Sequence, residues 1–341
     1  MPKRERKAEK KEEVGKKKGK KAAKEENKPE KPLPVRPMIP RSLTPRQPLL
    51  PDSTPHLRML SYNVNGLRAM LRKEESRDAL ASLLADHRPH ILALQETKIN
   101  PENEADVTES LQTLLAERSL PTYTAHFFSA TAKKGYSGTA MLLLDDNQEG
   151  SGPKVISVSR GMDLAEGDAE GRVMTVEYES CFVVNSYTPN AGDKLQRLTW
   201  RTTTWDAKLA DYVSNLSATH GKPAILGGDL NAVDKDVDFF NPHEPRAKKQ
   251  ACTTPEERKS FAAQFLGNSF KDTFRLLHPN AEGCYTYFST RARNRPFNRG
   301  LRIDYWLVPE TAANNVYDAY IVEEAAAAAS DHSPVGLIFK V

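Results

Sequence analysis

The fold is decided by a short stretch that reads PAILGGDLNAV at residues 223–233. Its apolar run, Ala224 to Leu226, predicts a buried strand, and two glycines separate that run from Asp229 and Asn231. Residues two apart on an extended segment face the same side, so a carboxylate and an amide end this strand together. Taken alone, the stretch also fits a turn, because Asn and Asp side chains bond nearby backbone groups.

The same pattern ends five other apolar segments, which we expect to be strands at 57–69, 90–98, 181–190, 301–308 and 330–341. Turns do not easily explain so many polar ends, whereas strands that share sheets can bring their ends to one face. A cluster of carboxylates, amides and an imidazole is costly to bury without a counter-ion, so the pattern predicts a divalent cation. Oxygen ligands without thiolates favour Mg²⁺, with Mn²⁺ as a substitute.

Helical patterns lie between these strands. Leucines and alanines recur at helical spacing over 73–87 and 106–119, and a long amphipathic segment covers 195–221. Helices that alternate with strands indicate an α/β protein, and the hairpin-like segments 173–187 and 284–308 predict mixed sheets.

Charge is distributed unevenly along the 341 residues. Residues 1–50 hold 17 Lys and Arg against 7 Asp and Glu, whereas the remainder is mildly acidic. We expect a disordered basic arm at 1–30, an extended Pro-rich linker at 31–56 and one catalytic domain at 57–341. The arm fits a nuclear-localisation signal, a nucleic-acid patch or a contact for repair proteins, but equally a solvated tail; its acidic residues make a mitochondrial presequence less favoured.

The composition argues against several classes of protein. No apolar run approaches the roughly 20 residues that span a membrane, and no signal-peptide segment is found. The three cysteines, Cys181, Cys252 and Cys284, are widely spaced, which argues against a disulfide framework and for a reducing compartment.

Eight motifs occur in order along the body: SYNVNGLRA, LQETK, GYSGTAMLL, EGRVMTVEY, SYTPNAG, GGDLNAV, RIDYWLV and SDHSPV. Together they resemble the exonuclease III-type AP endonucleases of the endonuclease/exonuclease/phosphatase superfamily, from about residue 57 to the C-terminus. The resemblance implies a four-layer α/β sandwich, in which two mixed β-sheets pack face to face with helices outside. It also implies a monomer that hydrolyses double-stranded DNA on the 5′ side of abasic sites with Mg²⁺, leaving a 3′-hydroxyl and a 5′-deoxyribose phosphate.

The resemblance assigns roles to the polar strand ends. The catalytic groups would be Tyr187, Asp229, Asn231, Asp304 and His332, and sequence leaves open whether His332 or Asp229 is the base. The metal ligands would come from Asn63, Asn65, Glu96, Asp229, Asn231 and Asp331, with Glu96 holding the ion. DNA would be contacted by Lys98, Tyr136, Arg172, Asn190, Tyr287, Asn298 and Leu301, and the arginine-rich segment 289–302 would form a loop beside the cleft.

Asn65, Tyr287 and Leu301 stand where the vertebrate-type enzymes have Asp, Phe and Trp, and Asp193 stands where some members of the family have a basic residue that inserts into DNA. The altered sugar pocket leads us to expect 3′-end processing or 3′→5′ exonuclease activity beside incision. Phosphatases, sphingomyelinases and deadenylases of the same superfamily remain alternatives, since they share the catalytic set. A non-enzymatic nucleic-acid-binding module is less favoured, because the catalytic groups are all present.

Overall fold

The computed structural model describes residues 36–51, 53–145, 153–268, 270–322 and 329–341. The chain divides into two units, Met1–Pro37 and Met38–Val341. The basic arm expected at 1–30 lies outside the described residues, and so does the start of the expected linker. The account below concerns the second unit.

Two six-stranded sheets form this unit. The first contains, in spatial order, β11 (Val316–Ile321), β12 (Val335–Lys340), β1 (His56–Asn63), β2 (Ile91–Gln95), β4 (Thr139–Leu144) and β3 (Tyr123–Phe128). The second contains β5 (Val155–Arg160), β6 (Val173–Tyr178), β7 (Phe182–Tyr187), β8 (Ala224–Asp229), β10 (Asp304–Pro309) and β9 (Phe270–Asp272). The pairs β1–β2 and β7–β8 are parallel and the others antiparallel, so both sheets are mixed, as predicted.

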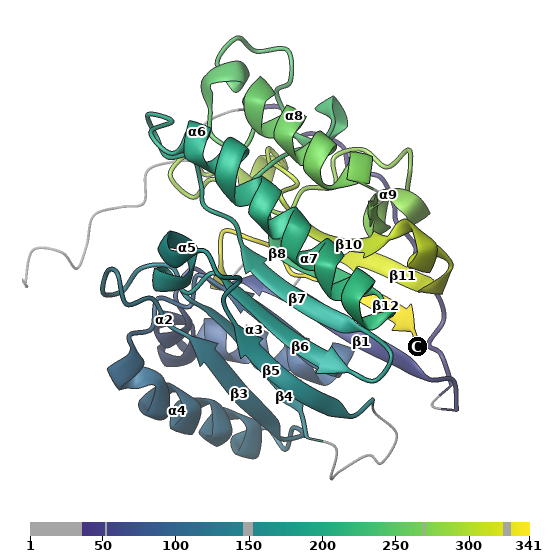
Figure 1. The fold of residues 1–341 in the computed structure, drawn as a ribbon. Coiled ribbons are helices and arrows are strands. Elements are labelled where there is room, and N and C mark those ends of the chain that lie inside the picture. The colour runs from purple at the N-terminus through teal and green to yellow at the C-terminus, as the bar shows by residue number, and fades with distance from the viewer. Residues whose placement is uncertain (1–35, 52, 146–152, 269, 323–328) are drawn as a thin grey trace, which may run out of the picture. The chain divides into compact units, whose positions relative to one another are not determined.

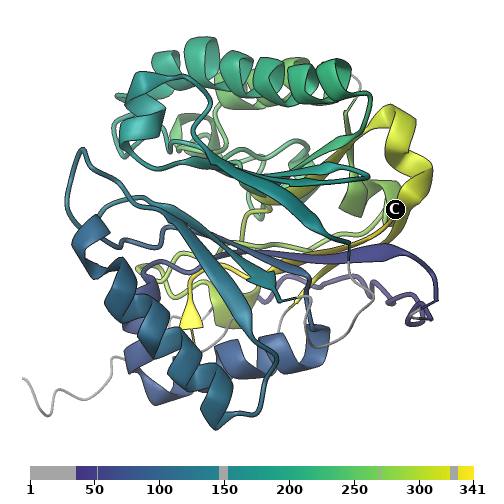
Figure 2. The same cartoon turned by 60° about the horizontal axis from the view of Figure 1, so that its bottom comes forward.

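Helices cover the outer face of each sheet (Figures 1 and 2). The first sheet is covered by α2 (Leu67–Arg72), α3 (Glu74–His87) and α4 (Glu104–Glu117), and the second by α7 (Asp206–His220) and α8 (Pro255–Gln264). The shorter helices are α5 (Ala165–Ala169), α6 (Leu198–Trp200) and α9 (Thr273–Leu277). The predicted helices are confirmed, except that the one expected at 195–221 contains a π-helical turn at Arg201–Trp205. The four-layer α/β sandwich is therefore confirmed.

The alternation along β1 shows how one strand serves two apolar layers. Leu57 and Met59 pack between the two sheets, whereas Leu60 and Tyr62 pack against the helices. Side chains alternate in direction along a strand, so a central strand of this sandwich must be apolar on both faces. This requirement explains why central strands such as β2 and β8 are apolar over most of their length.

The register of the strands brings the polar ends to one edge. In the parallel pairs Asn63 lies beside Gln95, and Tyr187 lies beside Asp229. β10 runs antiparallel to β8 and begins at that same edge, where Asp304 pairs with Asp229. β12 likewise begins there beside the end of β1, so the residues just before it, including His332, reach the same place.

The two glycines of the opening stretch have separate structural reasons. A Cβ on Gly227 would lie 2.3 Å from the Trp306 ring, which packs against the bare backbone from β10. Gly228 has a φ of 138°, and a Cβ there would lie 1.9 Å from the backbone oxygen of Ser186 on β7. The glycines thus allow close packing of three neighbouring strands, and Asp229 is delivered to the edge by that packing.

The two hairpin-like segments differ in outcome. β6 and β7 form the antiparallel pair expected at 173–187. In the segment 284–308, only isolated bridges join Tyr287 to Leu301 and to His332 among the described residues, and β10 starts at Asp304. The expectation at 284–308 is met only by the antiparallel bridge between Tyr287 and Leu301; the residues between them form a loop, and β10 follows as a separate strand.

Residues 38–50, which we call the strap, lie along the second unit. Backbone bonds join Ile39 N to Phe297 O at 3.0 Å and Ser42 N to Glu282 O at 2.9 Å. Further along, Arg46 Nε donates to Asp318 Oδ2 at 2.5 Å, and its guanidinium lies 3.1 Å from the centre of the Tyr320 ring. The described part of the Pro-rich segment thus has specific contacts with the domain. None of the described helices is long and apolar enough to cross a membrane.

Candidate active site

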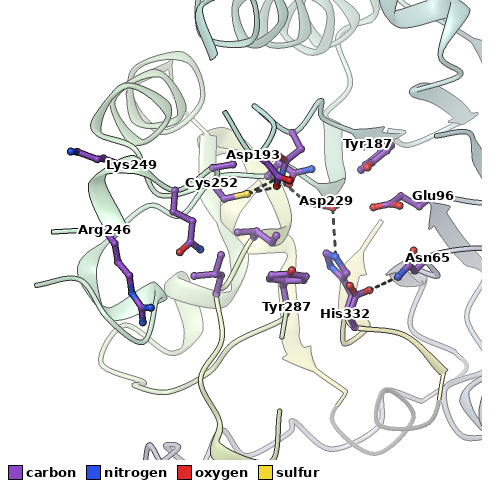
Figure 3. A pocket seen from close by; sticks show the side chains of 17 residues that line it. Asn65, Glu96, Tyr187, Asp193, Asp229, Arg246, Lys249, Cys252, Tyr287 and His332 are labelled. Carbon is purple, nitrogen blue, oxygen red and sulfur yellow. Dashed lines mark hydrogen bonds and ion pairs between the residues drawn. The ribbon is translucent and has the colours of Figure 1, made fainter. Parts of the chain in front are cut away.

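The polar strand ends surround a cleft of about 670 Å³ (Figure 3). Glu96 and Asn65 lie at one end of it, and Arg246 and Lys249 lie at the other. Ten of the predicted site residues line the cleft: Asn65, Glu96, Tyr187, Asn190, Asp229, Asn231, Tyr287, Leu301, Asp331 and His332. Residues that are far apart in sequence therefore meet in one cavity.

A buried imidazole lies between two carboxylates at the centre of the site. His332 Nδ1 lies 2.9 Å from Asp304 Oδ2, and His332 Nε2 lies 3.9 Å from Asp229 Oδ2. All three side chains are buried. The carboxylate of Asp304 fixes the orientation of the ring, so that Nε2 is directed toward Asp229 and the cleft.

Asn63 joins this group to Glu96. Its Nδ2 donates to Asp229 Oδ2 at 2.9 Å and to Glu96 Oε1 at 3.0 Å. Asn63 is the last residue of β1 and is fully buried, so its backbone is fixed by the sheet. Its side-chain amide therefore holds the two carboxylates at fixed positions. Asn63, which was predicted with Glu96 among the metal ligands, thus lies beside it.

The Glu96 end of the cleft contains a second set of charges. Lys98 Nζ lies 2.9 Å from Glu96 Oε2 and also donates to Asn65 Oδ1. Asn65 Nδ2 in turn donates to Asp331 Oδ1 at 3.0 Å. Lys98 thus neutralises Glu96 in this structure, and Asn65 links the β1 end to the turn that carries His332.

The pKa values of Asp229 and His332 depend on each other's charge and on that of Asp304. Burial and the nearby Asp304 carboxylate raise the pKa of Asp229 to about 7. Burial opposes a charge on His332, but Asp304 and Asp229 outweigh it and raise the pKa of His332 to about 10. At neutral pH the imidazole is therefore protonated, while Asp229 is close to its own titration.

Tyr187 is held by a cationic group from the neighbouring strand. The Arg172 guanidinium lies 4.5 Å from the centre of the Tyr187 ring and donates to the Tyr187 carbonyl oxygen at 2.8 Å. Arg172 also donates to the hydroxyl of Tyr136 and pairs with Glu170. Burial and the Glu96 charge raise the pKa of Tyr187 well above its usual range, so its hydroxyl is neutral and able to donate.

The amide of Asn231 is fixed by several partners. Its Nδ2 donates to the Thr188 carbonyl at 2.9 Å, and its Oδ1 accepts from Asn190 Nδ2 at 2.9 Å. Its backbone nitrogen donates to Asp229 Oδ1 at 3.0 Å. The buried Arg201, from the π-helical turn, donates to the Leu230 carbonyl at 2.7 Å and also to that of Asn231. These hydrogen bonds hold the end of β8, from Asp229 to Asn231, in one conformation.

The donor set fits a divalent cation. Glu96, Asp229, Asp304 and Asp331 bring four carboxylates together here, and burial and the nearby Asp304 charge raise the pKa of Asp229, so a cation beside it would stabilise its charged form. Glu96, flanked by the amides of Asn63 and Asn65, offers hard oxygen ligands at the open end. Among the described residues, ligand atoms of Asp229, Asp304 and His332 also lie within 4.8 Å of one another.

Some residues assigned to DNA contact have structural partners. Asn298 Nδ2 donates to the carbonyls of Ile39 and Gly283, away from the residues that line the cleft. In the arginine-rich loop, Arg302 is buried against Asp238 at 2.8 Å, and Arg295 donates to the carbonyl of His332 at 3.0 Å. These two arginines therefore stabilise the fold and the His332 turn, and a role of Asn298 in DNA contact stays a prediction.

Sequence reasoning missed one wall of the cleft. This wall comes from the loop before α8 and consists of Arg246, Lys249, Gln250, Ala251 and Cys252. No spacing within this loop indicates from the sequence that it reaches Asn231. Ile303 also lines the cleft, next to the predicted Leu301.

Comparison with known proteins decides the family. The endonuclease/exonuclease/phosphatase family matches residues 60–332. The chain belongs to this family. The resemblance to its exonuclease III-type AP endonucleases is also confirmed by two relatives. An exodeoxyribonuclease of Bacillus subtilis is 36% identical over 285 residues, which cover 84% of this chain and 100% of that protein. A DNA-(apurinic or apyrimidinic site) endonuclease of Dictyostelium discoideum is 34% identical over 284 residues, which cover 83% of this chain and 70% of that protein.

Solved structures of the family agree with the fold. An AP endonuclease from Leishmania major superposes with a TM-score of 0.75 at 28% identity and covers 89% of this chain and 93% of its own. A 3′-5′ exonuclease from Neisseria meningitidis gives a TM-score of 0.65 at 25% identity, with coverage of 84% and 100%. The family members that this chain is similar to thus include proteins named for different cleavage activities.

Proposed function

We propose that this family member is a DNA-repair nuclease that hydrolyses the phosphodiester on the 5′ side of an abasic site with Mg²⁺. The observation that carries the proposal is the continuous chain of contacts from Asp304 through His332, Asp229 and Asn63 to Glu96 at the edge of the cleft. This chain of contacts supports a mechanism in which a base, a cation and a metal ligand act on one phosphate.

The two central groups take different roles. Asp229, whose pKa burial and the Asp304 charge raise above the usual range of a carboxyl, is suited to accept a proton from the attacking water. His332, with a pKa of about 10, is suited to remain an imidazolium that offsets the charge on the phosphate. Of the two bases left open by the sequence, the geometry and the charges favour Asp229.

Two neutral donors complete the phosphate site. Asn231 uses one Nδ2 hydrogen on Thr188, and the second has no acceptor among the described residues, so it can donate to a phosphate oxygen. The neutral hydroxyl of Tyr187 interacts with Glu96 in this structure and could turn to donate to the phosphate instead. A divalent cation held by Glu96 would stabilise charge on the phosphate and on the leaving oxygen.

The walls of the cleft suit a DNA strand with a missing base. Leu301 and Ile303 give an apolar patch beside Tyr287, which could accept a sugar without a base. Lys249 and Arg246, at the far end, could contact the backbone phosphates. Asp193 also lines the cleft and would repel a phosphate placed against it, which favours release of the cut product.

A second activity, removal of blocked or unpaired 3′ ends, is favoured by Leu301, whose side chain in this patch is smaller than the Trp of the vertebrate-type enzymes. Relatives of this chain are named both as AP endonucleases and as exonucleases. We therefore propose 3′-end processing beside incision, at the same centre.

The decisive experiment compares matched duplexes with Mg²⁺ or with EDTA. One carries a single tetrahydrofuran abasic analogue, one is undamaged, and one ends in a recessed 3′-phosphate. We expect incision 5′ to the analogue, slower release from the blocked end, and loss of both with EDTA and in Asp229→Asn. The control is Asp78→Asn, an exposed acid paired with Arg118.

Two outcomes would overturn the assignment. Incision of the undamaged duplex at the same rate would refute recognition of abasic sites. Failure to cut any duplex, combined with phosphate release from inositol phosphates, would assign the protein to a phosphatase branch of the family. Turnover of abasic DNA without any action on blocked 3′ ends would refute the second activity alone.

A further inference from the structure

The thiol of Cys252 contacts two amides of the proposed phosphate site. Cys252 Sγ donates to Asn231 Oδ1 at 3.2 Å, and Asn190 Nδ2 donates to the same sulfur at 3.3 Å. Asn190 Nδ2 also donates to Asn231 Oδ1 at 2.9 Å, so the three side chains form a closed triangle. In the cleft wall that the loop before α8 supplies, Figure 3 shows Cys252 at the end nearest Asp229, whereas Arg246 and Lys249 lie farther out.

The backbone at Cys252 is in a conformation that favours glycine. Its φ is 73°, in the left-handed region, which a residue with a Cβ adopts only at a cost in free energy. A bond from Val233 N to the Cys252 carbonyl, at 2.9 Å, fixes the loop in this place. Glycine would satisfy this backbone without strain, but it would not supply the thiol.

The thiol helps determine which end of the Asn231 amide faces the cleft. Oδ1 accepts from Asn190 and Cys252, and Nδ2 donates to Thr188. If the amide turned over, the Asn190 donor would face Nδ2 and the Thr188 carbonyl would face Oδ1, which are repulsive contacts, and the hydrogen bond from the Cys252 thiol to Oδ1 would be lost. The remaining N–H is therefore held toward the cleft.

We propose that Cys252 is a positioning residue, which orients the amides of Asn231 and Asn190 so that an N–H of Asn231 is presented to the scissile phosphate. The proposal rests on the proposed function, since it assumes that Asn231 donates to that phosphate. It assigns a role to a residue that lies 21 positions from Asn231 in the sequence.

Three substitutions separate positioning from stability. Cys252→Ala removes the thiol and keeps the strained φ, whereas Cys252→Gly removes both, so the glycine variant should be at least as stable to heat. We nevertheless expect both to lose about tenfold in kcat on an abasic duplex, the loss of one oriented hydrogen bond, with KM little changed. Cys252→Ser keeps a donor and an acceptor and should retain most of the rate. Cys181→Ala, at a buried thiol outside the cleft, is the matched control.

A double-substitution cycle tests whether the effect passes through Asn231. In an Asn231→Ala background, Cys252→Ala should cause no further loss, because the group that it orients is gone. A full tenfold loss in that background would overturn the proposal, and so would wild-type rates in the glycine and alanine variants. A rate that falls only in proportion to thermal stability would also overturn it.

A measurement without substrate distinguishes this proposal from the proposed function. The side-chain amide signal of Asn231 in a ¹⁵N NMR spectrum should shift and broaden in Cys252→Ala but not in Cys181→Ala. If wild-type protein cuts no abasic duplex, the proposed function fails, and this signal still decides whether Cys252 orients the amide. An unchanged signal would overturn the positioning role.

Discussion

His332 and Asp304 form a buried pair in which Nδ1 lies 2.9 Å from Oδ2, and this pair determines the charge of the ring that faces Asp229. The folded-state pKa of His332, about 10, lies above its ordinary value of 6.5. Its contribution to folding stability is therefore fully present below about 6.5 and is lost as the pH rises through about 10. The same proton is the one that we assign to phosphate neutralisation.

Replacement of Asp304 by Asn should lower the pKa of His332, because it removes the carboxylate that contributes most to raising it. The alkaline fall in incision rate, expected near pH 10 for the wild type, should then move to lower pH. Rate profiles on abasic duplex and ¹H NMR titration of the ring both measure this shift. An alkaline limb that stays in place in Asp304→Asn would show that His332 is not the group that titrates there.

Replacement of Glu96 by Gln should raise the Mg²⁺ concentration for half-maximal incision by about tenfold or more, because it removes the charged oxygen at the open end of the cleft. Calorimetric titration with Mg²⁺ should show the same weakening without substrate. Glu102→Gln is the control, since Glu102 is an exposed acid paired with Lys134. Equal Mg²⁺ dependence in the two variants would remove Glu96 from the metal site.

The strand ends could be predicted from sequence because each depends on local pattern. Apolar runs that stop at Asn63, Glu96, Tyr187 and Asp229 indicate where strands end whatever the fold. That they converge follows from parallel pairing, which the alternation of helices and strands already favours. The separation of roles between Asp229 and His332 was beyond the sequence, since it depends on burial and on the Asp304 charge.

Some positions depend on long-range packing, which the sequence pattern does not predict. Positive charge in the loop 289–302 suggested DNA contact, but it does not indicate that Arg302 is buried against Asp238. The place of Cys252 depends on how the loop before α8 folds back over Asn231, and no local signal encodes that contact. The contacts of the strap likewise join residues more than 200 positions apart, such as Arg46 and Asp318.

Replacement of Asp238 by Ala should lower the free energy of unfolding by roughly 3–5 kcal/mol, because Arg302 and Arg275 would lose the buried carboxylate that they share. Burial opposes this charge, but the two arginines outweigh it and hold the pKa of Asp238 at about 2. Its contribution is thus present above the unfolded value of 3.8 and is lost as the pH falls through about 2.

Urea unfolding at neutral and at acid pH measures the Asp238 effect. The difference between wild type and Asp238→Ala should be largest at neutral pH and should shrink as the pH approaches 2. A difference that is independent of pH would mean that lost packing, rather than the ion pairs, explains the destabilisation.

Replacement of Arg46 by Ala should test whether the strap stabilises the domain. The change leaves the buried Asp318 without the guanidinium that now lies 2.5 Å from it, and it removes the cation from the Tyr320 ring. We expect a loss of roughly 1–3 kcal/mol in unfolding free energy, the cost of a buried acceptor that loses its donor. Arg77→Ala, which breaks the solvent-exposed pair with Glu117, should cost no more than about 1 kcal/mol. Equal losses in the two variants would show that the strap pair is worth no more than an ordinary surface ion pair, whereas a larger loss for Arg46→Ala would make residues 38–50 part of the folded catalytic domain in energy as well as in position.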